Sequence, residues 1–155
     1  MHLADVEQAA FEICPKVYTG ELDLNSTKSV RQLGYKRSST PPKPDQVAIV
    51  RGTRDQTVMI LSSKNFNSED PFCMIFAAAP NVQNLFDSLS DEAKGRGFIV
   101  GKPEPYHSDG ARIVAFDSPY VPKQEIFFME ATGGSYNIDS ASVLLIAYFP
   151  KRDKN

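Results

Sequence analysis

The sequence predicts an α+β fold with a mostly antiparallel sheet of about six strands and two to three helices. Three observations lead to this fold class. Two stretches with apolar residues at helical spacing precede the first β-rich run, a third such stretch lies in mid-chain, and the later β-rich runs follow one another without intervening helices. Parallel strands need a crossover helix between each pair, whereas antiparallel strands need only a turn. We therefore expect the order helix, helix, strands, helix, strands.

The composition is that of an ordinary globular domain. Of the 155 residues, 41 % are hydrophobic and 23 % are charged, and the net charge is −2. This length and balance predict a single domain over residues 1–155. The longest apolar runs, 72–79 and 143–149, are less than half of the roughly 20 residues that a membrane helix needs, so no membrane span is expected.

Helical spacing and capping residues predict the helices. Residues 3–14 form an amphipathic pattern that Pro15 is expected to end. A second helix is expected over 26–33, with Asn25 or Ser26 as its cap and Gly34 after its last turn. A third is expected to begin after Asn81 and to end at Gly95 or Gly97. Its shared apolar face consists of Val82, Leu85, Phe86 and Leu89.

The strands are predicted from short β-rich runs between proline, glycine and aspartate residues. The proline-rich segment 38–44 is expected to be a loop. Runs 47–50 and 57–61 favour a hairpin, and Pro71 and Pro80 enclose an apolar run over 72–76 that is too short for a globular helix. Further strands are expected at 98–100, 111–117, 125–131 and 142–149.

Several predicted strands are apolar on both faces. In run 72–76, Phe72, Met74 and Phe76 alternate with Cys73 and Ile75, and runs 125–131 and 142–149 repeat this pattern. A sheet with one wet face should instead alternate apolar with polar residues. Either the helices divide between the two faces or the sheet curls. Alternatively, one face binds a partner chain, a second copy or an apolar ligand, with Phe72, Met74 and Phe76 as candidate binding residues.

The two cysteines, Cys14 and Cys73, are 59 positions apart. They are either two separate buried thiols or one disulfide, and we predict that they are bonded, which implies an exported protein. Residues 1–14 carry acidic residues where a signal peptide would be basic and apolar, so Met1 is expected to replace a removed leader. With two histidines and two distant cysteines, neither a metal site nor a cofactor is expected.

Catalytic motifs are not evident in this sequence. It contains no G-x-S-x-G elbow, G-x-G-x-x-G turn or P-loop. His107 is the one histidine far from the start of the chain, and we include it, with Tyr35, among the possible binding residues. It could also act with Asp109 or Asp117 in a small hydrolase-like enzyme. That enzyme is the alternative to the function favoured below.

Positive charge is concentrated in one segment. Residues 28–54 carry seven basic residues and one acid, a net +6 against −8 for the rest of the chain. Such a segment can be a solvated surface, or it can bind nucleic acid or anionic lipid, with Tyr35 placed to stack on a base. Because the chain as a whole is acidic, nucleic-acid binding is not expected.

The pattern resembles a loose family of small exported bacterial proteins of unknown function. The residues that carry the resemblance are Ala10-Phe11-x-x-Cys14, Leu33-Gly34-Tyr35, Cys73 before the helix with Leu85 and Leu89, and the terminal strands. The resemblance implies a cleaved leader, a periplasmic or secreted location and a Cys14–Cys73 bridge. We therefore expect a non-catalytic binding or interaction module of the cell envelope, whose partner is another protein, a second copy or a small apolar ligand.

Overall fold

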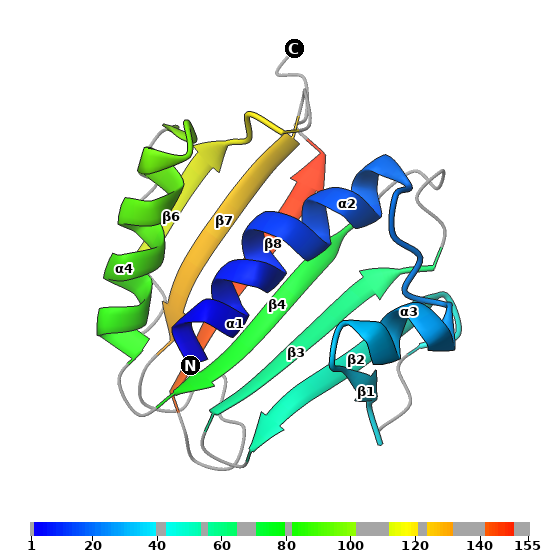
Figure 1. Ribbon diagram of the computed structural model, residues 1–155. Coiled ribbons are helices and arrows are strands. Elements are labelled where there is room, and N and C mark those ends of the chain that lie inside the picture. The colour runs from blue at the N-terminus through cyan, green and yellow to red at the C-terminus, as the bar shows by residue number, and fades with distance from the viewer. Residues whose placement is uncertain are drawn as a thin grey trace.

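A computed structural model describes residues 2–39, 43–53, 56–64, 71–79, 82–101, 112–120, 124–131 and 142–150. It confirms the α+β class and the antiparallel sheet, which has eight strands in place of about six. His107, Asp109 and the middle of the predicted loop 38–44 lie outside the described residues. Figure 1 shows the helices lying on the viewer's side of one twisted sheet.

The helical segments are α1 (His2–Gln8), the π-helical turn η1 (Ala9–Ile13), α2 (Cys14–Thr19), α3 (Thr27–Gln32) and α4 (Val82–Gly95). The strands are β1 (Lys36–Arg37), β2 (Gln46–Thr53), β3 (Gln56–Ser63), β4 (Cys73–Ala79), β5 (Ile99–Val100), β6 (Arg112–Asp117), β7 (Gln124–Ala131) and β8 (Ser142–Pro150). The predicted hairpin is β2–β3, and its strands are longer than their apolar runs. The two-residue strand β1 was missed, because two adjacent basic residues carry no strand signal.

Two antiparallel meanders form the sheet. Strands β1 to β4 follow one another, strands β5 to β8 do the same, and the order across the sheet is β1-β2-β3-β4-β8-β7-β6-β5. Helix α4 connects the meanders, so that β4 and β8 pair in the middle of the sheet. The short strands β1 and β5 consequently lie at its two edges.

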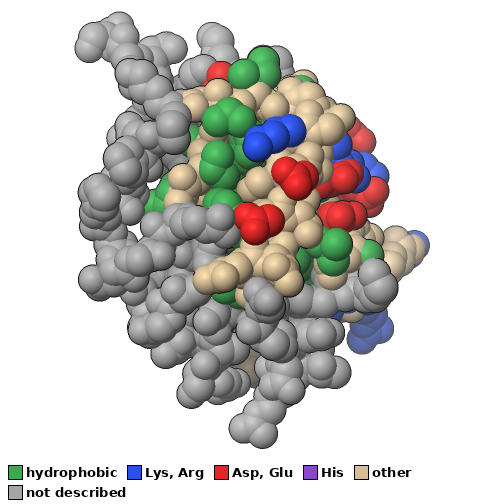
Figure 2. All heavy atoms as spheres, turned by 90° about the vertical axis from the view of Figure 1, so that its left-hand side faces the viewer, with side chains coloured by type: hydrophobic (Ala, Val, Ile, Leu, Met, Phe, Trp, Pro, Cys, Tyr) green, Lys and Arg blue, Asp and Glu red, His purple; other side chains and the backbone are tan. Residues whose placement is uncertain are grey.

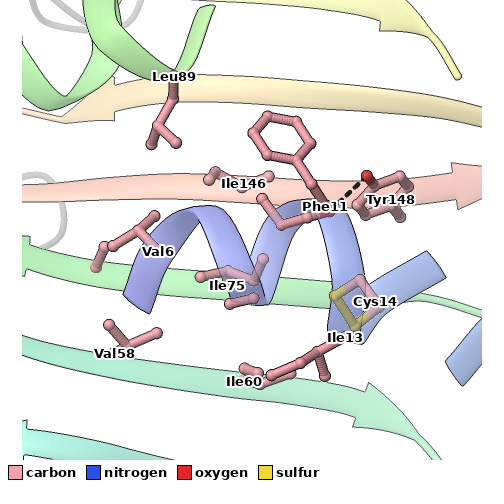
Figure 3. Close-up of a cluster of buried hydrophobic side chains, with 14 of the residues drawn as sticks. Val6, Phe11, Ile13, Cys14, Val58, Ile60, Ile75, Leu89, Ile146 and Tyr148 are labelled. Atoms are coloured by element: carbon pink, nitrogen blue, oxygen red, sulfur yellow. Dashed lines mark hydrogen bonds between the residues drawn. A yellow bond between two sulfur atoms is a disulfide. The ribbon is translucent and has the colours of Figure 1, made fainter. Parts of the chain in front are cut away.

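One face of the sheet builds the main hydrophobic core. Register aligns Ile49, Ile60, Ile75 and Ile146 in a row across four strands, and all four side chains are fully buried. The helical segment α1–α2 packs over this row, and helix α4 packs beside that segment on the same face, over β7 and β8 (Figures 1 and 3). The alternative in which the helices divide between the two faces is therefore wrong for the described helices.

The first helix continues past Pro15, contrary to the prediction that it ends there. In η1 the N–H of Cys14 donates to the carbonyl of Ala9, and Pro15 has no N–H to donate. The carbonyl of Ala10 thus lacks its usual helical donors. The buried hydroxyl of Tyr148 on β8 donates to it at 2.6 Å (Figure 3). A tertiary hydrogen bond therefore stabilises the carbonyl that the proline leaves unpaired, and the helix runs on to Thr19.

A Tyr148→Phe variant tests this role. It leaves the Ala10 carbonyl buried without its side-chain donor, so we expect the free energy of unfolding to fall by about 1–3 kcal/mol. Urea denaturation measures the change. Tyr120→Phe is the matched control, because Tyr120 is 39 % exposed and water can replace its hydroxyl as a partner of Arg96, so the loss of that hydroxyl should cost less than about 0.5 kcal/mol. Equal, small effects of both substitutions would contradict the role of Tyr148.

The predicted disulfide is confirmed. Cys14 begins α2 and Cys73 begins β4, their Cα atoms are 5.8 Å apart, and both residues are fully buried beneath the helix. Together with the Tyr148 hydrogen bond, the disulfide attaches the N-terminal helix to the two central strands of the sheet.

Candidate functional site

The predicted binding residues Phe72, Met74 and Phe76 face away from the helices, on the surface that we call the second face. By register this surface also carries Val50, Met59, Leu61 and Leu145. All seven side chains are half-buried. No helix of the described ranges covers them. Their role in binding stays a prediction.

Tyr35 lies beneath the surface. Its side chain is 4 % exposed, and the guanidinium of Arg51 lies 5.5 Å from its ring centroid. Arg51 also donates to the carbonyl of Leu33 and lies 3.6 Å from a carboxylate oxygen of Asp5. The ring is therefore enclosed by the protein's own side chains in this structure and presents no open face to a ligand.

Burial also changes the ionisation of two tyrosines. It raises the pKa of Tyr148, and it raises the pKa of Tyr35 despite the opposing charge of Arg51. An unfolded tyrosine ionises near pH 10. Below about pH 10 the two tyrosines are therefore neutral in both the folded and the unfolded protein, and the stability that their burial contributes is fully present. Above it the unfolded chain ionises first, and this stability is lost as the pH rises.

We expect the free energy of unfolding to fall above about pH 10 by about 1.4 kcal/mol per pH unit for each of these two groups. Urea unfolding at several alkaline pH values measures the slope. Tyr148→Phe should remove the contribution of one group. A free energy that stays constant to about pH 11 would contradict the burial of both hydroxyls.

The basic segment occupies one edge of the sheet. Its described members lie on α3, on β1 and in or just before β2, and these are Lys28, Arg31, Lys36, Arg37, Lys43 and Arg51. Arg37 donates to the carbonyls of Leu24 and Asn25 at 2.8 and 2.6 Å. Arg37 and Arg51 therefore donate to nearby backbone carbonyls, so two of these basic residues have a structural role.

The opposite edge carries the most exposed large apolar side chains of the described residues. Ile99 and Val100 on β5 are 67 % and 44 % exposed. Ile99 faces the side of the sheet that lies away from the helices. Between Val100 and α4 lies an open groove of about 300 Å³, which we call the α4–β5 groove. Its lining residues are Phe86, Asp87, Ser90, Asp91, Lys94, Val100 and Val114. Figure 2 looks onto this side and shows hydrophobic side chains next to a group of carboxylates.

Local sequence accounts for the exposure of β5. Gly97 takes a φ of +91°, and the N–H of Phe98 donates to the carbonyl of Ala93, so the chain turns sharply after α4. Phe98 then packs into an aromatic cluster, with its ring centroid 5.5 Å from that of Phe11 and 6.3 Å from that of Phe116. Because Phe98 is held in this cluster, the next two residues, Ile99 and Val100, lie at the edge of the sheet.

The polar groups that a ligand could reach in this groove are charged. Asp87, Asp91 and Lys94 are exposed, and they lie about one turn apart on α4. The hydroxyl oxygen of Ser90 is enclosed and has no hydrogen-bond partner, so it lies under the groove and not in it. Glu92 accepts from Arg96 at 2.8 Å, and Arg96 lies 4.7 Å from the ring centroid of Phe11. The reachable charge is therefore two carboxylates followed by one ammonium group.

This arrangement suits binding better than covalent chemistry. The described lining residues include no histidine or cysteine, and their one hydroxyl is enclosed. Within the described ranges, no three side chains of the metal-binding types gather closely enough to hold an ion. In the same part of the chain, every helix is too short or too polar to cross a bilayer.

The sequence did not identify the groove. Phe98, Ile99 and Val100 form an unbroken apolar run, which is typical of a buried strand. The one available signal was the pair Asp87 and Asp91, four positions apart on the predicted helix. Comparison with protein-family models, with curated proteins and with solved structures found no match to this chain.

Proposed function

We propose that this protein is an exported, non-catalytic binding module that recognises a segment of another protein at the α4–β5 groove. The observation that carries this proposal is the exposed apolar side chain of Val100, which lines the groove at the edge of the sheet. An exposed apolar patch next to an open strand edge is the kind of surface that polypeptides bind.

The disulfide supports the export part of the proposal. Disulfides persist in oxidising compartments such as the periplasm and the extracellular space, and cytosolic reductants keep most thiols reduced. Both cysteines of this chain are bonded to each other. The resemblance to small exported bacterial proteins points to the same location.

The shape of the groove favours a polypeptide over a small apolar ligand. Small-molecule sites usually enclose most of the ligand in about 300–1,000 Å³. This groove is at the lower end of that range and is open, with Val100 44 % exposed on its wall. A chain segment can lie along such a groove without being enclosed.

Exposure also favours the groove over the second face. Val100, on the wall of the groove, is 44 % exposed, whereas Met74 and Phe76 are half-buried within the protein itself. A partner gains free energy in proportion to the apolar area that it newly removes from water. At β5, a partner can therefore remove more apolar area per residue from water.

An NMR titration of the labelled protein tests this proposal. The probe is a synthetic peptide of about nine residues, a usual strand length, with valine alternating with threonine and lysine. We expect shift changes confined to α4 and β5 and the neighbouring residues of β6. Val100→Ser should weaken binding by about tenfold, because Val100 lines the groove. Phe149→Ser is the matched control, because Phe149 is 37 % exposed on the second face and should leave the affinity unchanged. Shift changes centred on the second face would refute the proposed site.

A further inference from the structure

The backbone of β5 presents hydrogen-bonding groups to the outside. Ile99 pairs with Asp117, and the N–H of Gly101 donates to the carbonyl of Ala115 at 2.8 Å. Residues of an antiparallel strand alternate in the direction of their N–H and C=O groups. Val100 lies between Ile99 and Gly101, so its N–H and C=O point away from β6, toward an edge where no further strand of the described ranges lies. A strand placed there can pair with both groups.

The side chains beside this edge would fit one apolar residue of such a strand. Val100 and Val114 project from β5 and β6 toward the helix layer, and Phe86 comes from α4 to meet them. Phe86 is 7 % exposed and Val114 is partly buried, whereas Val100 is 44 % exposed. An added apolar side chain would cover Val100 and extend the core by one residue.

The carboxylates above the groove would fit a cation. Asp87 and Asp91 lie one helical turn apart on the exposed side of α4, a rise of about 6 Å. Side chains two positions apart on a strand face the same side and are about 6.7 Å apart. When one such side chain covers Val100, the next one on the same side can reach the carboxylates. Lys94, one turn beyond Asp91, would repel a second cation further along.

We propose that the α4–β5 groove binds an extended polypeptide segment that bears lysine or arginine and adds to the sheet beside β5. This inference rests on the proposed function and specifies its ligand. The segment pairs its backbone with Val100, places an apolar side chain over Phe86 and Val114, and places a basic side chain two positions away against Asp91. The expected recognition pattern is an apolar residue, then any residue, then a basic residue.

Fluorescence anisotropy with two labelled peptides tests the charge requirement. Both have about nine residues of alternating valine and threonine, a usual strand length, with a central lysine in one and glutamate in the other. We expect the lysine peptide to bind at least about tenfold more tightly, with a difference that shrinks as salt is raised. Asp91→Lys should reverse the preference. Asp45→Lys is the matched control, because Asp45 is an exposed acid just before β2 and should leave the preference intact.

N-methylated peptides test the backbone pairing. Methyl groups on alternate amides along one edge of the lysine peptide should abolish binding, and methyl groups along the other edge should have little effect. Equal affinity for the lysine and glutamate peptides, or equal tolerance of methylation on both edges, would overturn the inference. In either case, shift changes at the groove would still support the proposed function. If neither peptide binds at millimolar concentration, both proposals fail.

Discussion

Replacing both cysteines, in the variant Cys14→Ala/Cys73→Ala, is expected to lower the free energy of unfolding by about 4 kcal/mol. The disulfide closes a loop with a sequence separation of 59 residues. In the chain-entropy account, a loop of that length restricts the unfolded chain by about this amount. For a chain of this size, such a loss lowers the melting temperature by roughly 8–16 °C. Guanidinium denaturation and calorimetry measure the two quantities.

The wild-type protein in a strong reductant is the control for this variant. It should show nearly the same midpoint, because reduction also removes the covalent link but leaves the side chains in place. Any further loss in the alanine variant measures the packing of two fully buried sulfur atoms. A total loss below about 1 kcal/mol would contradict the view that the disulfide stabilises the docked N-terminal helix.

The regular elements could be predicted because their signals are local. The apolar face of α4 includes the four residues that the spacing indicated, all of them buried in the structure, together with Ala93. Ser26 caps α3, where its side chain accepts from the N–H of Ser29, and Gly34 follows that helix with a φ of +84°. Capping and periodicity depend on neighbours within a few positions, so the sequence alone carries them.

The continuation of the first helix could not be predicted in the same way. Pro15 is a local stop signal, but its effect is offset by Tyr148, which lies far away in the sequence and donates to Ala10. Only the order of the strands brings these residues together. The pairing of β4 with β8 is itself a long-range feature, since α4 and three strands lie between them in the chain.

The candidate site depends on the strand order as well. An apolar pattern shows which side chains avoid water, but exposure depends on whether a strand has a neighbour on each side. Phe76 in β4 has neighbouring strands on both sides, whereas Val100 belongs to an edge strand. Both residues are apolar in the sequence, and only the position in the sheet separates the half-buried Phe76 from Val100, which is 44 % exposed.

Substitution of two consecutive residues in β4 is expected to separate the two faces of the sheet energetically. Ile75→Ala should cost about 2–5 kcal/mol, because Ile75 is fully buried between Ile60 and Ile146 under the helices and its loss leaves a cavity. Met74→Ala, the matched control on the second face, removes a half-buried and flexible side chain and should cost less than about 1.5 kcal/mol. Urea unfolding of both variants gives the comparison. Equal losses would mean that the second face is packed as tightly as the helix-covered face, and the sheet would then have two cores instead of one.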